Sequence, residues 1–271
     1  MTTESATVHQ PSSSLLASSI GKNNLSVVYN QWRLLVQEFT ACGLTRATDR
    51  LPAIAGLADE YGKITGDSYI AGHWLEDLPR SLLWSVLKDG KRAKPYRAPS
   101  WSWASIEGHI EHSQYANSTK LVAQVVDHSL TLKGFHVYGE IHDACVTLLG
   151  PLYKATVQER LFVQKTIVSL VRSFKANESK NGMTRTDAPE LTFTDARFHL
   201  DLDNYRDPPA DADGNVEIYM LAIGEHEGDL CCGIAITQSS VGADTFRRVG
   251  YVEDLPNPKV EQFMLSVVTM V

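Results

Sequence analysis

The stretch Tyr96-Arg97-Ala98-Pro99-Ser100-Trp101-Ser102-Trp103-Ala104-Ser105 divides the chain into two parts of different character. Two of the five tryptophans stand two residues apart in it. In an extended backbone both rings point to one face of a sheet, because successive side chains of a strand alternate between faces. Pro99 favours an extended Ala98 and lacks a backbone donor, so the pattern predicts a strand entered through a proline-fixed turn.

The part before this stretch has the periodicity of helices. Apolar residues recur along Val27–Phe39 at helical spacing, which predicts a first helix. A second helix is expected between an N-cap at Thr48 and a stop near Gly62. The same spacing from Leu78 to Leu87 predicts a third helix, which carries Trp84.

After a basic, glycine-broken loop at 88–94 and the tryptophan stretch, the periodicity becomes that of strands. Six β-favouring segments are bounded by turn residues: Leu121–Leu132, Phe135–Leu149, Leu191–Leu202, Val216–Ile223, Leu230–Thr237 and Phe246–Val252. The segment Val157–Phe174 fits either a helix or a strand. We therefore expect an α+β protein in which N-terminal helices pack on a mainly antiparallel β-sandwich or barrel.

The chain of 271 residues is long enough to bury a sizeable core. Residues 1–24 contain many Ser, Thr and Ala and too little apolar surface to offset the entropy of ordering, so a disordered tail is expected there. Residues 25–271 are expected to form a single domain, with a helical part at 25–95 and a β-rich part at 96–271. No signal peptide and no apolar run of membrane-spanning length is present in the sequence.

The net charge and the cysteine content indicate which partner and which cellular compartment to expect. A net charge of −7 disfavours a broad phosphate-binding surface, so nucleic acid is not an expected partner. The four cysteines show neither a zinc-ligand spacing nor a disulfide framework, which favours a cytoplasmic protein.

Several motifs in a fixed order resemble one known family. They are Trp32, the run from Leu44 to Ala58, Tyr69 with Ala71-Gly72 and Trp74, Leu83-Trp84, and Arg97-Ala98-Pro99-Ser100-Trp101-Ser102-Trp103-Ala104-Ser105. Together, over roughly Gln31–Gly108, they resemble the region downstream of the effector domain in fungal heterokaryon-incompatibility (HET) proteins. The segments Glu217–Leu221 and Phe246–Gly250 resemble the closing strands of that region.

The resemblance implies an architecture more than a reaction, since the downstream region of these proteins has no generally assigned chemistry. In such proteins a HET domain precedes this region, and from Met1 there is no room for one, so the module is expected to act alone. One residue departs from the pattern: His73 stands where many relatives carry an apolar residue.

His73 is therefore a candidate for acid–base chemistry, with Tyr69 four residues before it and Trp74 beside it. A histidine that titrates near neutral pH beside an aromatic wall suits a general acid or base. The alternative is a histidine that is hydrogen-bonded and packed for structural reasons.

Two further groups of residues could bind a ligand. Arg46 and Asp49, with Arg50, could clamp an anion, or they could form a structural ion pair at the start of a helix. Tyr96, Arg97, Trp101 and Trp103 could line a pocket for a flat or polycyclic molecule by stacking and cation–π contact, or they could pack where helices meet the sheet.

Motifs for cofactors and metals are missing from the sequence. The histidines lack an HExxH or facial-triad pattern, the Asp-rich turns do not complete a calcium-binding loop, and no nucleotide-binding or nucleophile-elbow motif is present. The expectation is a protein without metal and without cofactor.

Two functions remain open. The first is a cofactor-independent enzyme of fungal specialised metabolism, of the cyclase, pericyclase or isomerase type. It would act on a small apolar or polycyclic substrate with His73, Arg97 and Tyr69 as catalytic residues. The second is a non-catalytic module that recognises a partner or ligand, as the family resemblance implies. A homo-oligomer is compatible with either.

Overall fold

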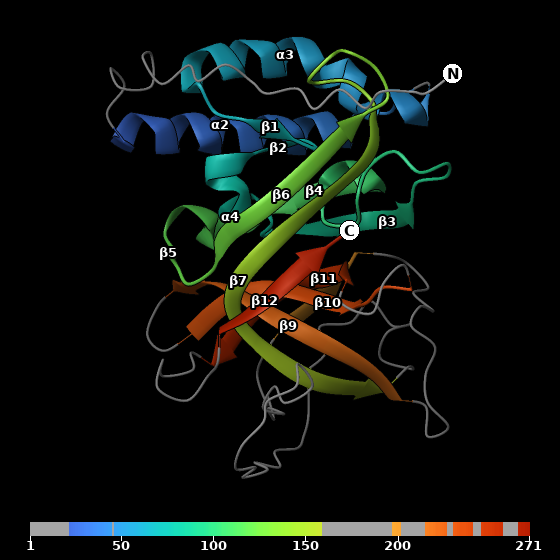
Figure 1. The fold of residues 1–271 in the computed structure, drawn as a ribbon. Coiled ribbons are helices and arrows are strands. Elements are labelled where there is room, and N and C mark those ends of the chain that lie inside the picture. The colour runs from blue at the N-terminus through green and yellow to red at the C-terminus, as the bar shows by residue number, and fades with distance from the viewer. Residues whose placement is uncertain are drawn as a thin grey trace.

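The computed structural model describes residues 22–44, 46–158, 197–201, 215–226, 230–240, 245–256 and 265–271. Two long helices lie at one end of the molecule and a β-barrel at the other, with short helices and two two-stranded sheets between them (Figure 1). The expected class, helices packed on a mainly antiparallel barrel, is confirmed. No helix of the described residues is both long and apolar enough to span a membrane.

The helical end is built from α2 (Lys22–Ala41) and α3 (Arg50–Thr65). α2 buries Trp32 and Val36 and contains the expected first helix, but it starts at Lys22, inside the segment expected to be a disordered tail. The rest of that segment lies outside the described residues. The stop of α3 is later than expected, because Gly66 provides the left-handed cap at φ 67°.

The N-cap expected at Thr48 is wrong. The single turn η1 (Ala47–Asp49) precedes α3, and Asp49 occupies the N-cap position without capping the helix through its side chain. The hydroxyl of Thr48 donates to the carboxylate of Asp49 instead, 3.1 Å away.

The third predicted helix is wrong beyond its first turn. After the turn η2 (Leu75–Asp77), α4 ends at Ser81 (Leu78–Ser81), and Trp84 begins the strand β3 (Trp84–Arg92), which also replaces most of the expected loop at 88–94. β3 pairs antiparallel with β4 (Ile106–His112). Buried Arg248 binds the carbonyls of Leu82 and Trp84, and these carbonyls therefore point away from a helix ladder.

Five strands close the barrel: β7 (Ile141–Gln158), β9 (Asn215–His226), β10 (Leu230–Gln238), β11 (Thr245–Pro256) and β12 (Leu265–Met270). Each pairs antiparallel with its neighbours, except that β11 and β12 run parallel. Additional strands extend it: β5 (Lys120–Leu121) on β9, β6 (Gln124–Leu132) on β7, and β8 (Arg197–Leu200) on β11.

Four of the six strand predictions are matched closely, and two need comment. Phe135 lies in the turn before β7 rather than in a strand, and β8 is the described part of Leu191–Leu202. Most of Val157–Phe174 lies outside the described residues. Residues of β9 face two hydrophobic clusters alternately, which explains the unbroken apolar run Met220–Ile223.

Candidate functional site

Trp101 and Trp103 are core residues and do not lie on a strand. Trp101 is in a turn, and Trp103 begins the single turn η3 (Trp103–Ser105); their side chains are 0% and 1% exposed. The strand prediction fails because serine side chains bind local backbone: Ser102 caps the N–H of Ala104, and Ser105 donates to the carbonyl of Ser102.

The tryptophan stretch is tied to the hairpin β1 (Tyr69–Ile70) and β2 (His73–Trp74). The indole N–H groups of Trp32 and Trp103 both donate to the carbonyl of Gly72, at 3.1 and 2.9 Å. The hydroxyl of Ser102 donates to the carbonyl of Ala71 at 2.6 Å. Motifs that are distant in sequence therefore meet at one turn.

His73 lies inside this core at 1% exposure. Its Nδ1 is 2.7 Å from the hydroxyl of Ser81, and its ring centroid is 5.7 Å from that of Trp101. Its Nε2 has no partner among the described residues. Burial, and then the charge of Arg248, lower the pKa of His73 to about 3, so the imidazole is neutral near neutral pH.

Tyr69 and Trp74 face each other across the β1–β2 hairpin, with ring centroids 5.2 Å apart. Trp32 and Tyr138 pack edge-on against both rings. Burial raises the pKa of the Tyr69 hydroxyl above its usual range. The structure thus brings Tyr69 and Trp74 into one packed aromatic cluster, whereas the ring of neighbouring His73 contacts Trp101.

Arg97 is 6% exposed, and backbone carbonyls occupy three of its N–H groups. It donates to the carbonyls of Ala104, Ala47 and Ile106, the last at 2.7 Å. This role as a structural clamp does not involve His73. Neighbouring Tyr96 is half exposed, and its hydroxyl accepts a hydrogen bond from the backbone of Ala144; burial raises its pKa to about 12.

The predicted pair of Arg46 and Asp49 is not an ion pair in the structure. Arg46 is exposed and precedes η1, where its carbonyl accepts from the backbone N–H of Asp49 at 3.2 Å. In the described part of the chain, no hydrogen bond, ion pair or ring contact joins Arg46 or Asp49 to the residues around His73, so the two candidate sites lie apart.

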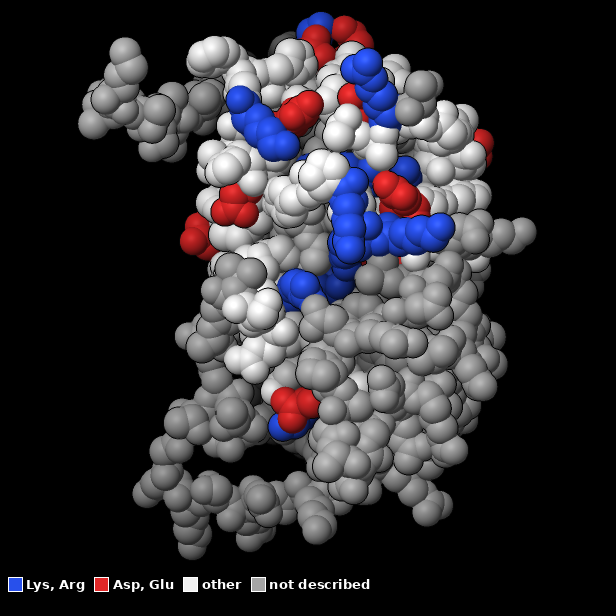
Figure 2. All heavy atoms as spheres, turned by 90° about the vertical axis from the view of Figure 1, so that its right-hand side faces the viewer, with Lys and Arg blue, Asp and Glu red and all other residues white. Residues whose placement is uncertain are grey.

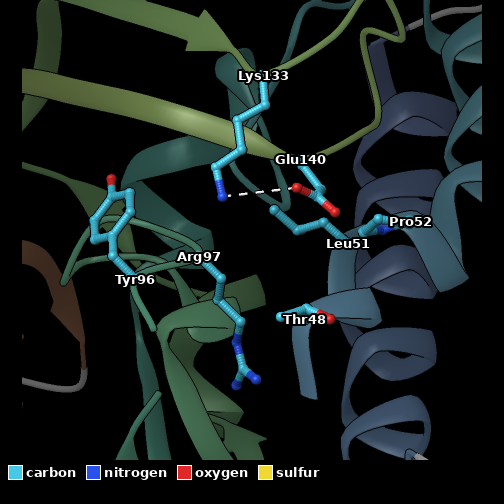
Figure 3. A pocket seen from close by; sticks show the side chains of 7 residues that line it. All are labelled: Thr48, Leu51, Pro52, Tyr96, Arg97, Lys133 and Glu140. Carbon is cyan, nitrogen blue, oxygen red and sulfur yellow. Dashed lines mark ion pairs between the residues drawn. The ribbon is translucent and has the colours of Figure 1, made fainter. Parts of the chain in front are cut away.

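A small surface pocket, whose empty space of about 300 Å³ includes open solvent, lies at the start of α3. Its lining consists of Thr48, Leu51, Pro52, Tyr96, Arg97, Lys133 and Glu140. Figure 3 shows the Lys133 amine directed toward Glu140, with Tyr96 and Arg97 on one side and α3 on the other. The Lys133 and Glu140 charges are 3.6 Å apart.

Lys133 and Glu140 were missed by the sequence reasoning. They close the turn between β6 and β7, where the backbone N–H of Lys133 donates to the carbonyl of Glu140 at 2.9 Å. Gly134 and Gly139, between two β-favouring segments, were the available signal for a hairpin with opposite charges at its base.

Among the residues that the structure describes, no group of three or more His, Cys, Asp or Glu side chains is arranged to hold a metal ion. Partly exposed His112 hydrogen-bonds the backbone of Ser81, and desolvation of its ring holds its pKa well below the usual range. Comparisons with protein-family models, with curated proteins and with solved structures found no match for this chain.

Proposed function

We propose that this chain is a non-catalytic recognition module that binds a partner protein through the turn between β6 and β7. The observation that carries the proposal is Phe135, whose side chain is 101% exposed within that turn. A phenylalanine that is buried on binding contributes about 1.5–3 kcal/mol, and aromatic side chains dominate many protein interfaces.

The turn that presents Phe135 is anchored to the core. Tyr138, three residues further on, packs against Tyr69 with ring centroids 5.1 Å apart and also approaches Trp74. Figure 1 shows the two long strands β6 and β7 crossing from the barrel to the helices, with this turn beside α3. Because the turn is anchored, its backbone loses little conformational entropy on binding, which favours recognition through Phe135.

The packing of the aromatic core also supports recognition over catalysis. Of the rings that could have lined a substrate pocket, those of Tyr69, Trp74, Trp101 and Trp103 are buried in the core, and the Trp103 indole N–H is bound to the carbonyl of Gly72. The residues that carry the HET resemblance therefore have a structural explanation, and the recognition role that the resemblance implies remains. We also propose a cytoplasmic location, which the free thiols of all four cysteines support.

Site-specific photocrosslinking tests this proposal. A photoreactive phenylalanine analogue is placed at Phe135 or, as a control, at exposed Leu265 on β12, in cells that produce the protein. We expect one defined protein adduct from position 135 and none from position 265. Excess unlabelled wild type should suppress the adduct, whereas excess Phe135→Ser should not. Equal suppression by both competitors would contradict the proposal.

The second candidate is the cofactor-independent cyclase or isomerase acting on a small apolar or polycyclic molecule. His73 favours it, because a neutral imidazole with an unpartnered Nε2 could accept a proton. The experiment that decides between the candidates compares the metabolites of three cell lines, which carry the wild-type gene, the His73→Phe variant or no copy of the gene. A compound that accumulates equally in the last two, and that the purified wild type converts, would support the enzyme. Identical metabolites in all three would exclude it.

A further inference from the structure

Three exposed cations, Arg46, Lys91 and Lys94, form no ion pair with a carboxylate in the described part of the chain. We call these three side chains the basic face. Other exposed lysines differ in this respect: Lys63, for example, is paired with two carboxylates of its own helix. Exposed cations that lack a counter-charge within the chain suit an anion that comes from outside it.

The basic face is gathered around the buried side chain of Arg97. Arg97 donates to the backbone carbonyl of the residue after Arg46 and, at 2.7 Å, to a carbonyl of β4. On β4, Glu107 is paired with Lys91 of β3, so these two side chains share one face of the hairpin. Lys94 precedes Arg97 by three residues. Segments that are distant in the sequence therefore bring the three cations to one region of the surface.

The local charge of this region is positive, although the whole chain has a net charge of −7. Six Lys or Arg residues and only two carboxylates lie on the three segments that meet here, 46–50, 91–97 and 106–108. Burial, and then the positive charge of Arg97, lower the pKa of Arg50 to about 10, and Glu107 is the carboxylate that acts on both guanidinium groups. Figure 2 shows Lys and Arg side chains gathered on the side of the molecule where β3 ends, with acidic side chains among them.

The basic face reaches the turn that carries Phe135 by way of the surface pocket. Tyr96 is half exposed, lies between two of the basic residues in the chain and lines the pocket. Lys133 and Glu140, at the base of the turn, line another part of it and neutralise one another at 3.6 Å (Figure 3). The carboxylate of Asp143, which acts on the Tyr96 hydroxyl, reduces the positive excess by one charge and leaves most of it. A partner that covers Phe135 therefore meets positive charge beyond the pocket.

We propose that the basic face binds an acidic segment, a run of Asp and Glu residues, of the protein partner that covers Phe135. Charge complementarity supports this assignment, because opposite charges across an interface speed association and select the partner. A nucleic acid fits less well, since the rest of this negatively charged chain would repel a long polyanion. The inference rests on the proposed recognition function, because the acidic segment belongs to the partner of Phe135.

Fluorescence anisotropy with the purified full chain tests the inference, with a labelled octaglutamate peptide as the probe and an octaglutamine peptide as its uncharged counterpart. We expect saturable binding of octaglutamate and none of octaglutamine. The affinity for octaglutamate should fall as NaCl rises from about 0.05 M to about 0.3 M, because contacts between exposed charges are screened.

The triple variant Arg46→Gln, Lys91→Gln and Lys94→Gln should weaken octaglutamate binding about tenfold, as the loss of three exposed charge contacts of modest strength would. The matched control replaces three lysines elsewhere on the surface by Gln: Lys63, Lys120 and Lys154. Both variants change the net charge of the chain by the same amount, so the control should weaken binding by no more than about twofold through long-range charge. The basic face is exposed and carries no ion pair, so its variant should fold.

Three results would overturn the inference. The first is the absence of saturable octaglutamate binding, and the second is equal weakening by the two triple variants. The third is tighter binding of a single-stranded oligonucleotide of the same net charge, lost in the basic-face variant, which would identify a nucleic acid as the ligand instead of an acidic segment.

The inference and the proposed function fail separately. Phe135→Ser should bind octaglutamate like the wild type, because this probe has no apolar group for Phe135 to contact. In cells, the photocrosslinked adduct at position 135 should be reduced in the basic-face variant and retained in the control. An adduct that both variants retain equally would leave recognition through Phe135 standing and remove the acidic segment. Octaglutamate binding without any adduct at position 135 would remove the proposed partner and, with it, the assignment of the acidic segment to that partner.

Discussion

At the scale of single residues, His73 shows how a side chain suited to acid–base chemistry can be held neutral. Ser81 fixes one ring nitrogen, and the surrounding rings exclude water from the other. The same burial couples this residue to stability, because a histidine that cannot accept a proton in the folded state can do so in the unfolded state. His73 therefore has a thermodynamic effect whether or not it has a catalytic one.

The pH dependence of unfolding should report this coupling. The folded-state pKa of His73 is about 3, below the ordinary value of 6.5. Its neutral form therefore costs the folded state nothing above pH 6.5, and the free energy of unfolding decreases as pH falls from 6.5 toward 3. Between pH 6.5 and pH 5 the free energy of unfolding should fall by on the order of 2 kcal/mol through this residue. Urea unfolding of wild type and His73→Phe, at both pH values, measures the difference.

The comparison with His73→Phe is needed because other titratable groups also change the free energy of unfolding with pH, some of them in the opposite direction. Burial raises the pKa of Asp67 to about 6, which by itself adds stability as pH falls through that value. Asp67 is present in both proteins, so its contribution cancels. If wild type and variant lost the same free energy between the two pH values, His73 would have to be accessible to protons in the folded state.

At the scale of elements, α3 contains one glycine that caps the helix and another that lies in its interior. Gly66 caps the helix in the left-handed conformation, whereas exposed Gly56 lies in the helix interior with no atom within 4 Å of an added Cβ. Gly66→Ala should cost about 1 kcal/mol, and Gly56→Ala should add about 0.5–1 kcal/mol. Thermal and urea unfolding of the two variants measure both signs. A stabilising Gly66→Ala would exclude the cap as the reason that the helix ends there.

Elements with local signals were predictable, and elements that depend on distant residues were not. α2 and most barrel strands follow from periodicity and turn residues. The error at Trp84 arises because leucine spacing at 78–83 resembles a helix, while Arg248, more than 160 residues away, takes the carbonyls that a helix would need. The tryptophan stretch was recognised as the junction, but serine contacts decided its conformation.

The residues of the candidate site also fall into those that local sequence patterns could identify and those that depend on distant residues. Tyr96 and Arg97 were found through their position beside the tryptophans, and both line the surface pocket. Lys133 and Glu140 become neighbours of Arg97 only when the β6–β7 hairpin reaches α3, which no local pattern specifies. His73 was chosen for its chemistry, but the structure buries it in the core and away from the surface pocket. A single sequence does not reveal whether one particular histidine is buried.

At the scale of the whole molecule, Arg248 joins the barrel to the part that carries the helices. From β11 its guanidinium binds Asp201 next to β8 and the carbonyls of Leu82 and Trp84, and it stacks on the Trp84 ring at 3.6 Å. The same strand reaches the tryptophan stretch, since the backbone N–H of Arg248 donates to the hydroxyl of Ser100 at 3.0 Å. The two parts should therefore unfold together.

Asp201→Asn tests this connection. The variant leaves the Arg248 charge buried without its counter-charge, which should cost about 3–5 kcal/mol. Lys63→Gln is the control, because it removes only exposed pairs with Asp59 and Glu60 and should leave the free energy of unfolding nearly unchanged. Urea unfolding is followed by tryptophan fluorescence, which reports the aromatic core, and by far-UV circular dichroism, which reports the whole chain. Coincident transitions are expected in wild type and in both variants, whereas separate transitions in the wild type would show that the barrel and the helical part are independent folding units.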